Sequence, residues 1–183
     1  MKKIFFLLLV ITPAFMAHAQ FEKAELQASG LTCSMCSNAI QKALRTLSFI
    51  EDIHTDLNKN LFTIVFKKNT TVDFDQVKKK VEGAGFSVAN FWITTDIHHL
   101  EINNDTHISL GGMNLHFMHV KQGTLDGKYR LQLIDKNFVL SKDYKKFSNY
   151  TTMSCYQTGT MQSCCKSKDG DLTTNDRIYH VTM

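Results

Sequence analysis

The stretch Gly30-Leu31-Thr32-Cys33-Ser34-Met35-Cys36 (GLTCSMC) places two thiols three positions apart. Residues 21–28, which precede this stretch, are expected to form a strand. Gly30, the first residue of the stretch, favours a loop after that strand. Cys36 is expected in the first turn of a helix, where unpaired N–H groups favour a thiolate over a thiol. The apolar residues that predict this helix by their spacing are Ile40, Ala43, Leu44 and Leu47.

Two thiolates on one loop are able to close around a single metal ion. Sulfur ligands select Cu(I), Zn(II) or heavier thiophilic ions over Mg²⁺ or Ca²⁺. The Cys-x-x-Cys spacing alone is also typical of thioredoxin-like redox centres and of half zinc sites. The residues that flank the two cysteines are therefore needed to decide between a soft-metal site, a redox centre and a half zinc site.

Those residues extend the pair into a longer pattern of Gly, an apolar residue, Thr, Cys, two variable residues and Cys. A second motif, Val81-Glu82-Gly83-Ala84-Gly85-Phe86, follows later in the chain. With both motifs, residues 24–92 resemble the heavy-metal-associated domain family, the small copper-binding module of metallochaperones and metal-pumping ATPases. The second motif is similar to the family's closing turn of helix, Ala-Gly and an aromatic residue.

The resemblance implies roles for four residues. Cys33 and Cys36 fall on the two metal thiolates of the family. Leu31, which stands where the family usually has Met, falls on the apolar residue that packs beneath the metal loop. Phe86 falls beside the metal, where soluble copper chaperones often carry Lys and ATPase-type domains commonly carry an aromatic residue. Phe86 therefore argues against a dedicated cytosolic-type shuttle and leaves metal binding unaffected.

The apolar pattern over residues 20–93 predicts the order strand, helix, strand, strand, helix, strand. An Asn-rich turn at residues 58–60 joins two strands, the second at residues 61–66. Asp73 is expected to cap the second helix, and residues 86–93 to form the last strand. This is the ferredoxin-like split βαβ layout, with one antiparallel sheet and both helices on one face. We therefore expect an α+β protein that begins with a ferredoxin-like βαββαβ domain.

Residues 1–19 have the features of a signal peptide. Two lysines open the segment, and the apolar run from Ile4 to Phe15 is 12 residues long, shorter than the roughly 20 that span a bilayer. Ala17-His18-Ala19 matches a cleavage site, so the mature chain is expected to start near Gln20. No later segment is long and apolar enough to span a bilayer. The sequence predicts a periplasmic or secreted protein whose mature chain does not insert into the membrane.

The mature chain is close to charge balance. Two of the 21 basic residues and none of the 17 acidic ones lie in the signal segment, which leaves a net charge near +2. No basic stripe with interleaved aromatic residues occurs, so no nucleic-acid partner is expected. Because a Gly-rich phosphate loop, a nucleophile elbow and an HExxH motif are also missing from the sequence, we do not expect an enzyme.

Residues 94–183 are expected to form a small mainly-β domain. Gly111-Gly112, Gly123 and Asp126-Gly127 predict turns, and a short helix is predicted over residues 143–149. An OB-like barrel is the preferred arrangement for several short strands separated by turns. The predicted strands cover residues 106–110, 115–120, 129–134 and 178–182.

Two methionines and three cysteines gather within a short stretch of this second region. Thioether and thiolate ligands together suit Cu(I), so the stretch is a candidate second metal site. The preferred alternative is a disulfide from Cys155 to Cys164 or to Cys165, which an oxidising compartment favours. The residues concerned are Met153, Cys155, Met161, Cys164 and Cys165.

Six of the eight histidines also lie in this region, and none is assigned as a ligand. His116 and Met118 alternate on one face of a predicted strand. They are expected to line the barrel or to face solvent, and the alternative is that both point at a common ligand. A surface role is expected for His98-His99.

The leading hypothesis is an exported soft-metal-binding protein, a Cu(I) chaperone or scavenger. Cys33 and Cys36 would hold one ion between two thiolates and pass it on by ligand exchange. The expected partners are the ion itself and a metal-exporting membrane protein or another periplasmic metal carrier.

Three alternatives remain. Small periplasmic mercury-binding proteins pair the same domain with an export signal, which makes Hg(II) an alternative cargo, but they lack a counterpart of the second region. Zn(II) would need ligands beyond the pair. A thiol–disulfide redox protein would use Cys33 and Cys36, or the three cysteines of the second region, but the Trp-Cys-Gly-Pro pattern of thioredoxin-like centres is absent.

Overall fold

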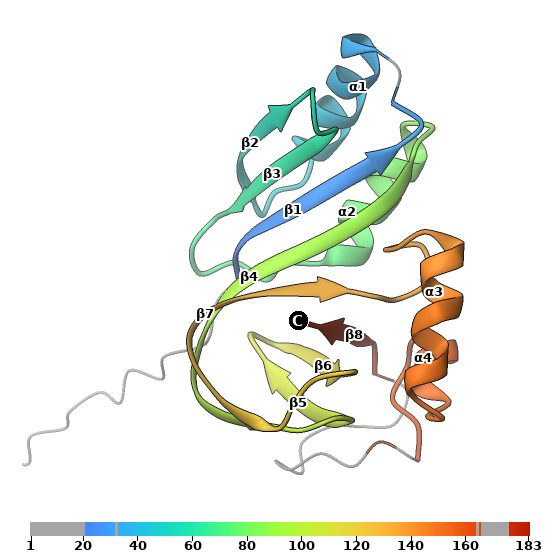
Figure 1. Ribbon diagram of the computed structural model, residues 1–183. Helices are drawn as coiled ribbons and strands as arrows, with labels where there is room; N and C mark the ends of the chain where they lie inside the picture. Colours follow the sequence, from blue (N-terminus) through green and yellow to red (C-terminus); the bar gives the residue numbers. More distant parts are fainter. Residues whose placement is uncertain (1–20, 32, 164, 166–175) are drawn as a thin grey trace, which may run out of the picture.

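The computed structural model describes residues 21–31, 33–163, 165 and 176–183, so the expected signal segment lies outside the described residues. Within them, the strands form one eight-stranded sheet in the order β2-β3-β1-β4-β7-β8-β6-β5 (Figure 1). No helix in this part of the chain combines the length and apolarity that a membrane crossing requires. The elements are β1 (Phe21–Ser29), α1 (Ser34–Leu44), β2 (Ile50–Asp56), β3 (Leu61–Phe66), α2 (Phe74–Gly83), β4 (Ser87–Ile102), β5 (Thr106–Leu110), β6 (Met113–Phe117), β7 (Gly123–Leu133), α3 (Ser141–Phe147), η1 (Ser148–Tyr150), α4 (Cys155–Thr158) and β8 (Ile178–Thr182).

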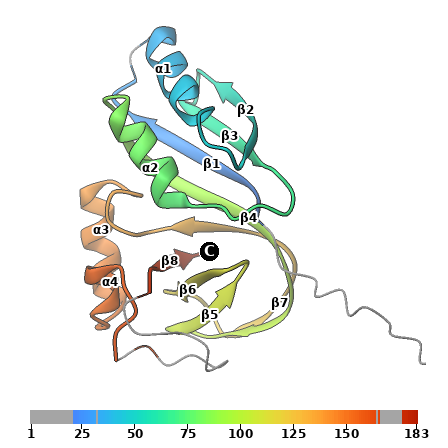
Figure 2. The same cartoon turned by 180° about the vertical axis from the view of Figure 1, so that it is seen from behind.

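The first six elements have the predicted ferredoxin-like order. Their four strands lie side by side as β2-β3-β1-β4, and every neighbouring pair is antiparallel. Both helices cover the same face of this half of the sheet, as the view from behind shows (Figure 2). The prediction for this half of the fold is confirmed.

Local sequence explains these elements. Side chains alternate across a strand, and the apolar alternates of β3, Phe62, Ile64 and Phe66, are all buried. At the start of α2, the Asp73 carboxylate accepts a hydrogen bond of 3.0 Å from the backbone N–H of Gln76, the expected cap. Val77 lies one turn further on and is completely buried, so the capped helix turns its apolar stripe to the sheet.

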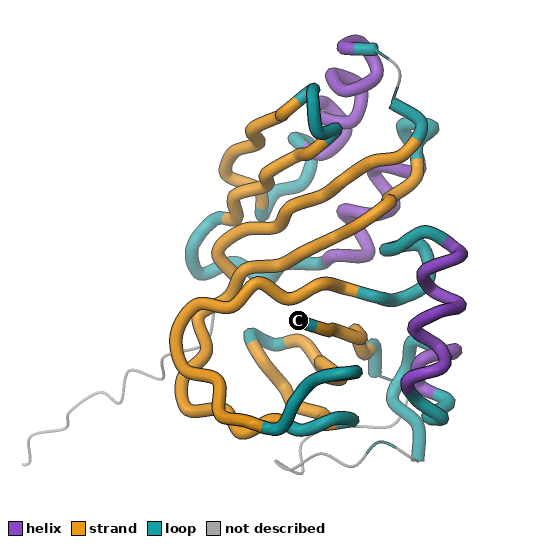
Figure 3. Tube along the Cα trace, in the orientation of Figure 1, coloured by secondary structure: helices purple, strands orange, loops and turns teal. Residues whose placement is uncertain are grey.

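The second half continues the sheet of the first, so the expected OB-like barrel is not confirmed. β4 runs through residues 93 and 94 without interruption and pairs with β7 from Phe91–Leu133 to Ile102–Gly123. β8 then pairs antiparallel with β7 and parallel with β6, and β5 closes the order as an edge strand. The sheet curls sharply where β4 and β7 bend together (Figure 3). A division into domains at residues 93 and 94 stays a prediction.

The predicted turns at Gly123 and at Asp126-Gly127 are wrong, because both lie inside β7. Two residues of β4, His98 and His99, oppose Asp126 alone, which makes a β-bulge. Gly127 borders this bulge at φ +104°, a backbone conformation that favours glycine. A glycine in a strand often marks such a bend rather than a chain reversal.

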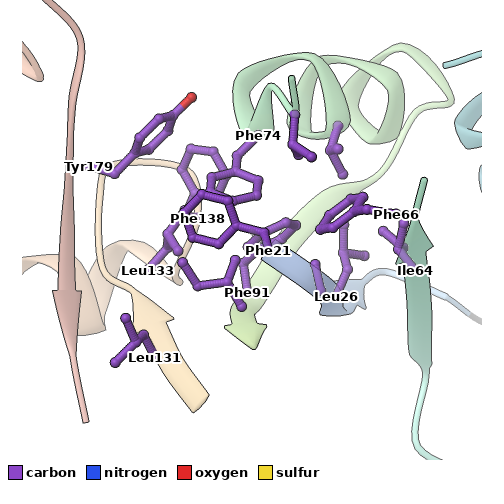
Figure 4. Packing of buried hydrophobic residues seen from close by; sticks show 14 of the residues in the cluster. Phe21, Leu26, Ile64, Phe66, Phe74, Phe91, Leu131, Leu133, Phe138 and Tyr179 are labelled. Atoms are coloured by element: carbon purple, nitrogen blue, oxygen red, sulfur yellow. The ribbon is translucent and has the colours of Figure 1, made fainter. Parts of the chain in front are cut away.

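An aromatic cluster joins the two halves beneath α2. The ring centroid of Phe74, on α2, lies 5.3 Å from that of Tyr179, on β8. Phe91, on β4, lies 5.4 Å from Phe138, which follows β7. Figure 4 shows these four rings together with Phe21, whose ring centroid lies 5.2 Å from that of Phe74. The two halves therefore share one apolar core.

Candidate metal centre

The cysteine loop leaves the end of β1 and enters α1. Gly30 adopts φ +81°, which turns the chain out of the strand. Cys33 is the N-cap of α1 in an extended conformation, and its carbonyl accepts hydrogen bonds from the N–H groups of Cys36, at 3.1 Å, and Ser37, at 3.4 Å. Cys36 thus lies in the first turn, as its position in the sequence predicts. The Cys33 side chain makes no capping hydrogen bond, so the helix end does not fix its sulfur.

The two sulfur atoms lie next to each other at the surface. Cys33 Sγ is 2.9 Å from Cys36 Sγ, with Cys33 exposed and Cys36 partly buried. Two metal–thiolate bonds of about 2.3 Å in a line would separate the sulfurs by about 4.6 Å. An ion bound between them therefore requires the thiols to move apart by roughly 1.7 Å. The exposed position of Cys33 makes this movement feasible.

Apolar residues support the loop from below. Leu31 and Phe86 are partly buried and pack against the core. Ser29 of β1 pairs with Ser87 of β4, so the loops that carry Leu31 and Phe86 leave the same end of the sheet. Met35, between the two cysteines, is 80% exposed. The loop thus has a packed base and an open outer side.

The Met–Cys stretch gathers around α4. Cys155 is completely buried and packs against Met161 and Ile178, while Met153 and Cys165 lie partly buried at the edge of the same cluster. Cys155 and Cys165 are not joined to each other in a disulfide, so one of the two expected pairings is not made. The other expected pairing involves Cys164, which lies outside the described residues.

Two histidines that the sequence did not single out as ligands meet Cys155. His107 Nε2 lies 3.9 Å and His116 Nδ1 3.7 Å from Cys155 Sγ, and all three residues are buried. His116 therefore does not face solvent, and neither does Met118. The sequence contained a signal for this contact, because the predicted turn at Gly111-Gly112 between the predicted strands 106–110 and 115–120 places residues 107 and 116 opposite each other.

The remaining histidine pair lies at the surface, as expected. His98 and His99 form the bulge of β4, with side chains 68% and 87% exposed. Their Nδ1 atoms lie 3.9 and 3.3 Å from the Asp126 carboxylate. These contacts link the bulge of β4 to β7. They contribute little to the stability of the fold, because interactions between exposed charged groups are weak.

Comparisons with known proteins concern the first half of the chain. Residues 25–87 match the family model of the heavy-metal-associated domain. The copper chaperone CopZ of Staphylococcus haemolyticus is 30% identical over 63 residues, which cover 34% of this chain and 91% of that protein. An Arabidopsis thaliana protein with the name "Probable copper-transporting ATPase HMA5" is 33% identical over 78 residues. That match covers 43% of this chain and only 8% of the ATPase.

A solved structure of the yeast copper transporter domain Ccc2a, in the apo and Cu(I)-loaded states, is also similar. It shares 29% identity over 36% of this chain and 88% of that chain, with a TM-score of 0.33. The family match ends at residue 87, before the bulge of β4 and all of the strands β5 to β8.

Proposed function

Because this chain belongs to the heavy-metal-associated domain family, we propose that Cys33 and Cys36 bind one Cu(I) ion as cargo. The observation that carries the proposal is the pair of adjacent sulfurs at the exposed N-terminus of α1. Thiolates prefer Cu(I) over hard cations, and relatives of this half of the chain have copper in their names. Hg(II) is the closest competing cargo, and Zn(II) would require two further ligands.

Transfer would proceed by ligand exchange. A thiolate or thioether of the partner bonds to the two-coordinate ion, and one cysteine sulfur then leaves. Copper remains Cu(I) throughout, so no electron moves. The open side of the loop at Met35 gives an incoming ligand access. The proposal requires no reaction on a substrate and hence no enzyme activity.

The partner would be a metal-exporting membrane protein or another metal carrier. In this proposal the protein acts outside the cytoplasm after removal of residues 1–19. The supporting features are the two lysines, the apolar run and the Ala17-His18-Ala19 site. The mass of the protein recovered from the periplasm or medium tests this step, since it should correspond to a chain that starts at Gln20. A full-length mass would contradict export with cleavage.

The binding test is an anaerobic competition for Cu(I) between the reduced protein and a chromogenic chelator. One tightly bound ion should be lost from the Cys33→Ser/Cys36→Ser variant. Cys165→Ser is the matched control, because it removes a thiol elsewhere and should leave this ion in place. Equal competition by the double variant and the unsubstituted protein would contradict the proposal. Parallel titrations with Hg(II) and Zn(II) establish the preferred cargo.

The 2.9 Å sulfur separation also favours a second candidate, a thiol–disulfide redox protein. The two thiols would lose two protons and two electrons to form a disulfide, and a disulfide substrate would accept both and become two thiols. Turnover of such a substrate, dependent on Cys33, distinguishes this function from metal transfer.

A further inference from the structure

A row of three buried histidines crosses the second half of the sheet. His107 on β5 is directly opposite His116 on β6, and His116 is directly opposite His180 on β8. The ring centroids are 4.1 Å apart for the first pair and 5.0 Å apart for the second. None of the three residues is more than 2% exposed. Such a concentration of imidazoles in a core requires a physical reason, because histidine is not a typical core residue.

Each imidazole is held from behind by an oxygen acceptor. His107 Nδ1 lies 2.9 Å from the backbone carbonyl of Asp105, and His116 Nε2 lies 2.9 Å from the carboxylate of the same residue. His180 Nδ1 lies 3.0 Å from the Asp135 carboxylate. Carbonyl and carboxylate oxygens only accept, so these nitrogens carry the hydrogens and the opposite nitrogens carry lone pairs. Metal-binding histidines are usually oriented in this way.

Two of the lone pairs face the sulfur of Cys155. His116 Nδ1 is 3.7 Å and His107 Nε2 3.9 Å from Cys155 Sγ. A single thiol proton satisfies only one of these nitrogens at a time, and a buried acceptor without a donor is unfavourable. A metal ion in the centre would satisfy both nitrogens and the sulfur together.

The distances fit an ion. Metal–sulfur and metal–nitrogen bonds of about 2.3 and 2.0–2.1 Å, at trigonal or tetrahedral angles, separate sulfur from nitrogen by about 3.5–3.8 Å. The observed sulfur–nitrogen separations are 3.7 and 3.9 Å, and the three ligand atoms lie within 4.8 Å of one another. Two metal–nitrogen bonds at these angles place the nitrogens about 3.3–3.6 Å apart, so the two imidazoles would move closer together when an ion binds. Because each ring donates through one nitrogen and keeps a lone pair on the other, both imidazoles are present in the neutral form that binds metals.

We propose that His107, His116 and Cys155 form a second metal site, which holds a resident Cu(I) ion in the core. This site is independent of the cysteine loop and of the proposed function. Binding converts the Cys155 thiol to a thiolate and releases its proton to solvent, with no change in the oxidation state of copper.

Ligand number and ligand type select copper. Three protein ligands suit Cu(I), whereas a structural Zn²⁺ site almost always has four protein ligands. The ligands are nitrogen and sulfur, so Mg²⁺ and Ca²⁺ are excluded, and a thiolate with two imidazoles is a known copper ligand set. Met161 packs against Cys155 and adds a polarizable thioether to the surroundings. Because the three ligands are buried, the ion should exchange slowly, unlike cargo on an exposed loop.

The test uses the full chain with Cys33→Ser and Cys36→Ser, so that the loop contributes nothing. After anaerobic loading with Cu(I) and removal of weakly held metal, we expect one copper per chain. Copper X-ray absorption should show mixed nitrogen and sulfur ligation. Adding Cys155→Ser, which replaces sulfur by oxygen at nearly the same size, should remove the ion, as should His116→Gln. His54→Gln, at an exposed histidine of β2, is the matched control and should retain it.

Three results would overturn the proposal. They are a loop double-serine variant without copper, ligation by sulfur alone, and preferential retention of Zn(II) when both ions are supplied. If the core variants fail to fold, the absorption spectrum of the loop variant decides, because its core is unaltered.

Discussion

The carboxylate of Asp75 accepts a hydrogen bond of 2.7 Å from the Arg177 guanidinium, and this ion pair joins α2 to the residue that precedes β8. The two residues are 102 positions apart. Tyr179 adds a hydrogen bond of 3.1 Å from its hydroxyl to the same carboxylate. Polar contacts thus reinforce the aromatic cluster that joins the two halves.

This pair predicts a loss of stability in acid. Burial alone would raise the pKa of Asp75, but hydrogen bonds from Arg177 and Lys78 outweigh it and lower the pKa to about 2. A carboxyl group with a lowered pKa stabilises the fold above its unfolded value near 4, and this contribution is lost as the pH falls to about 2. We expect a loss on the order of 2 kcal/mol from this group. Urea unfolding at pH 7, 4, 3 and 2 measures it.

Asp75→Asn should flatten that part of the pH dependence and lower stability at pH 7. The matched control is Glu51→Gln, at an exposed carboxylate of β2, which should preserve the full acid slope. Identical slopes for the two variants would show that Asp75 is not the group responsible.

Gly30 predicts a conformational effect on the cysteine loop. At φ +81° with no atom within 4 Å of an added Cβ, Gly30→Ala meets backbone strain and no clash. The strain should lower the free energy of unfolding by about 1–2 kcal/mol and weaken Cu(I) binding. Gly83→Ala is the control, because the last residue of α2 has helical φ and open space. That variant should be more stable by about 0.5–1 kcal/mol with unchanged Cu(I) affinity.

Much of the first half could be predicted because its signals are local. Asp73 lies three residues from the N–H that it caps, and Phe62, Ile64 and Phe66 alternate within one strand. The cysteine pair was predictable for the same reason, since both sulfurs belong to one helix start.

The fold of the second half depends on contacts between residues that are far apart in the sequence. Which of these residues pair cannot be read from a single sequence. β6 pairs in parallel with β8, and Phe117 is separated in sequence from its partner Val181 by more than sixty residues. The His107–Cys155 contact likewise joins residues 48 positions apart. Asp126-Gly127 has the composition of a turn, and only the bulge at His98 and His99 explains why the strand continues through it.

Phe138 predicts that both halves lose stability when the shared core is damaged. The residue is completely buried, and its ring contacts Phe91 and Tyr179. Phe138→Ala should reduce the free energy of unfolding by about 3–5 kcal/mol, because it leaves a cavity. Leu57→Ala removes an apolar side chain that is 53% exposed, and this control should change stability by less than about 0.5 kcal/mol. Chemical unfolding followed by tryptophan fluorescence reports both variants.

Oxidation should switch off metal uptake by the loop. The sulfurs at 2.9 Å need only a small approach to form a disulfide, which removes both thiolates. We expect the oxidised protein to lose Cu(I) binding at the loop and to regain it after reduction. Thiol titration beside copper analysis checks this. The Cys36→Ser variant cannot form this disulfide, so its residual copper content should be insensitive to mild oxidant, and a matching loss there would contradict the explanation.

Phe91 of β4 pairs with Leu26 on one side and with Leu133 on the other. Residues 91–95 of β4 pair with β1 along one edge and with β7 along the other, so a continuous sheet and not a hinge joins the two halves. The sheet therefore fixes the position of the cysteine loop relative to the second half of the molecule. In the proposed transfer, a partner that binds the second half of the molecule would therefore find the two thiols at a fixed distance and orientation.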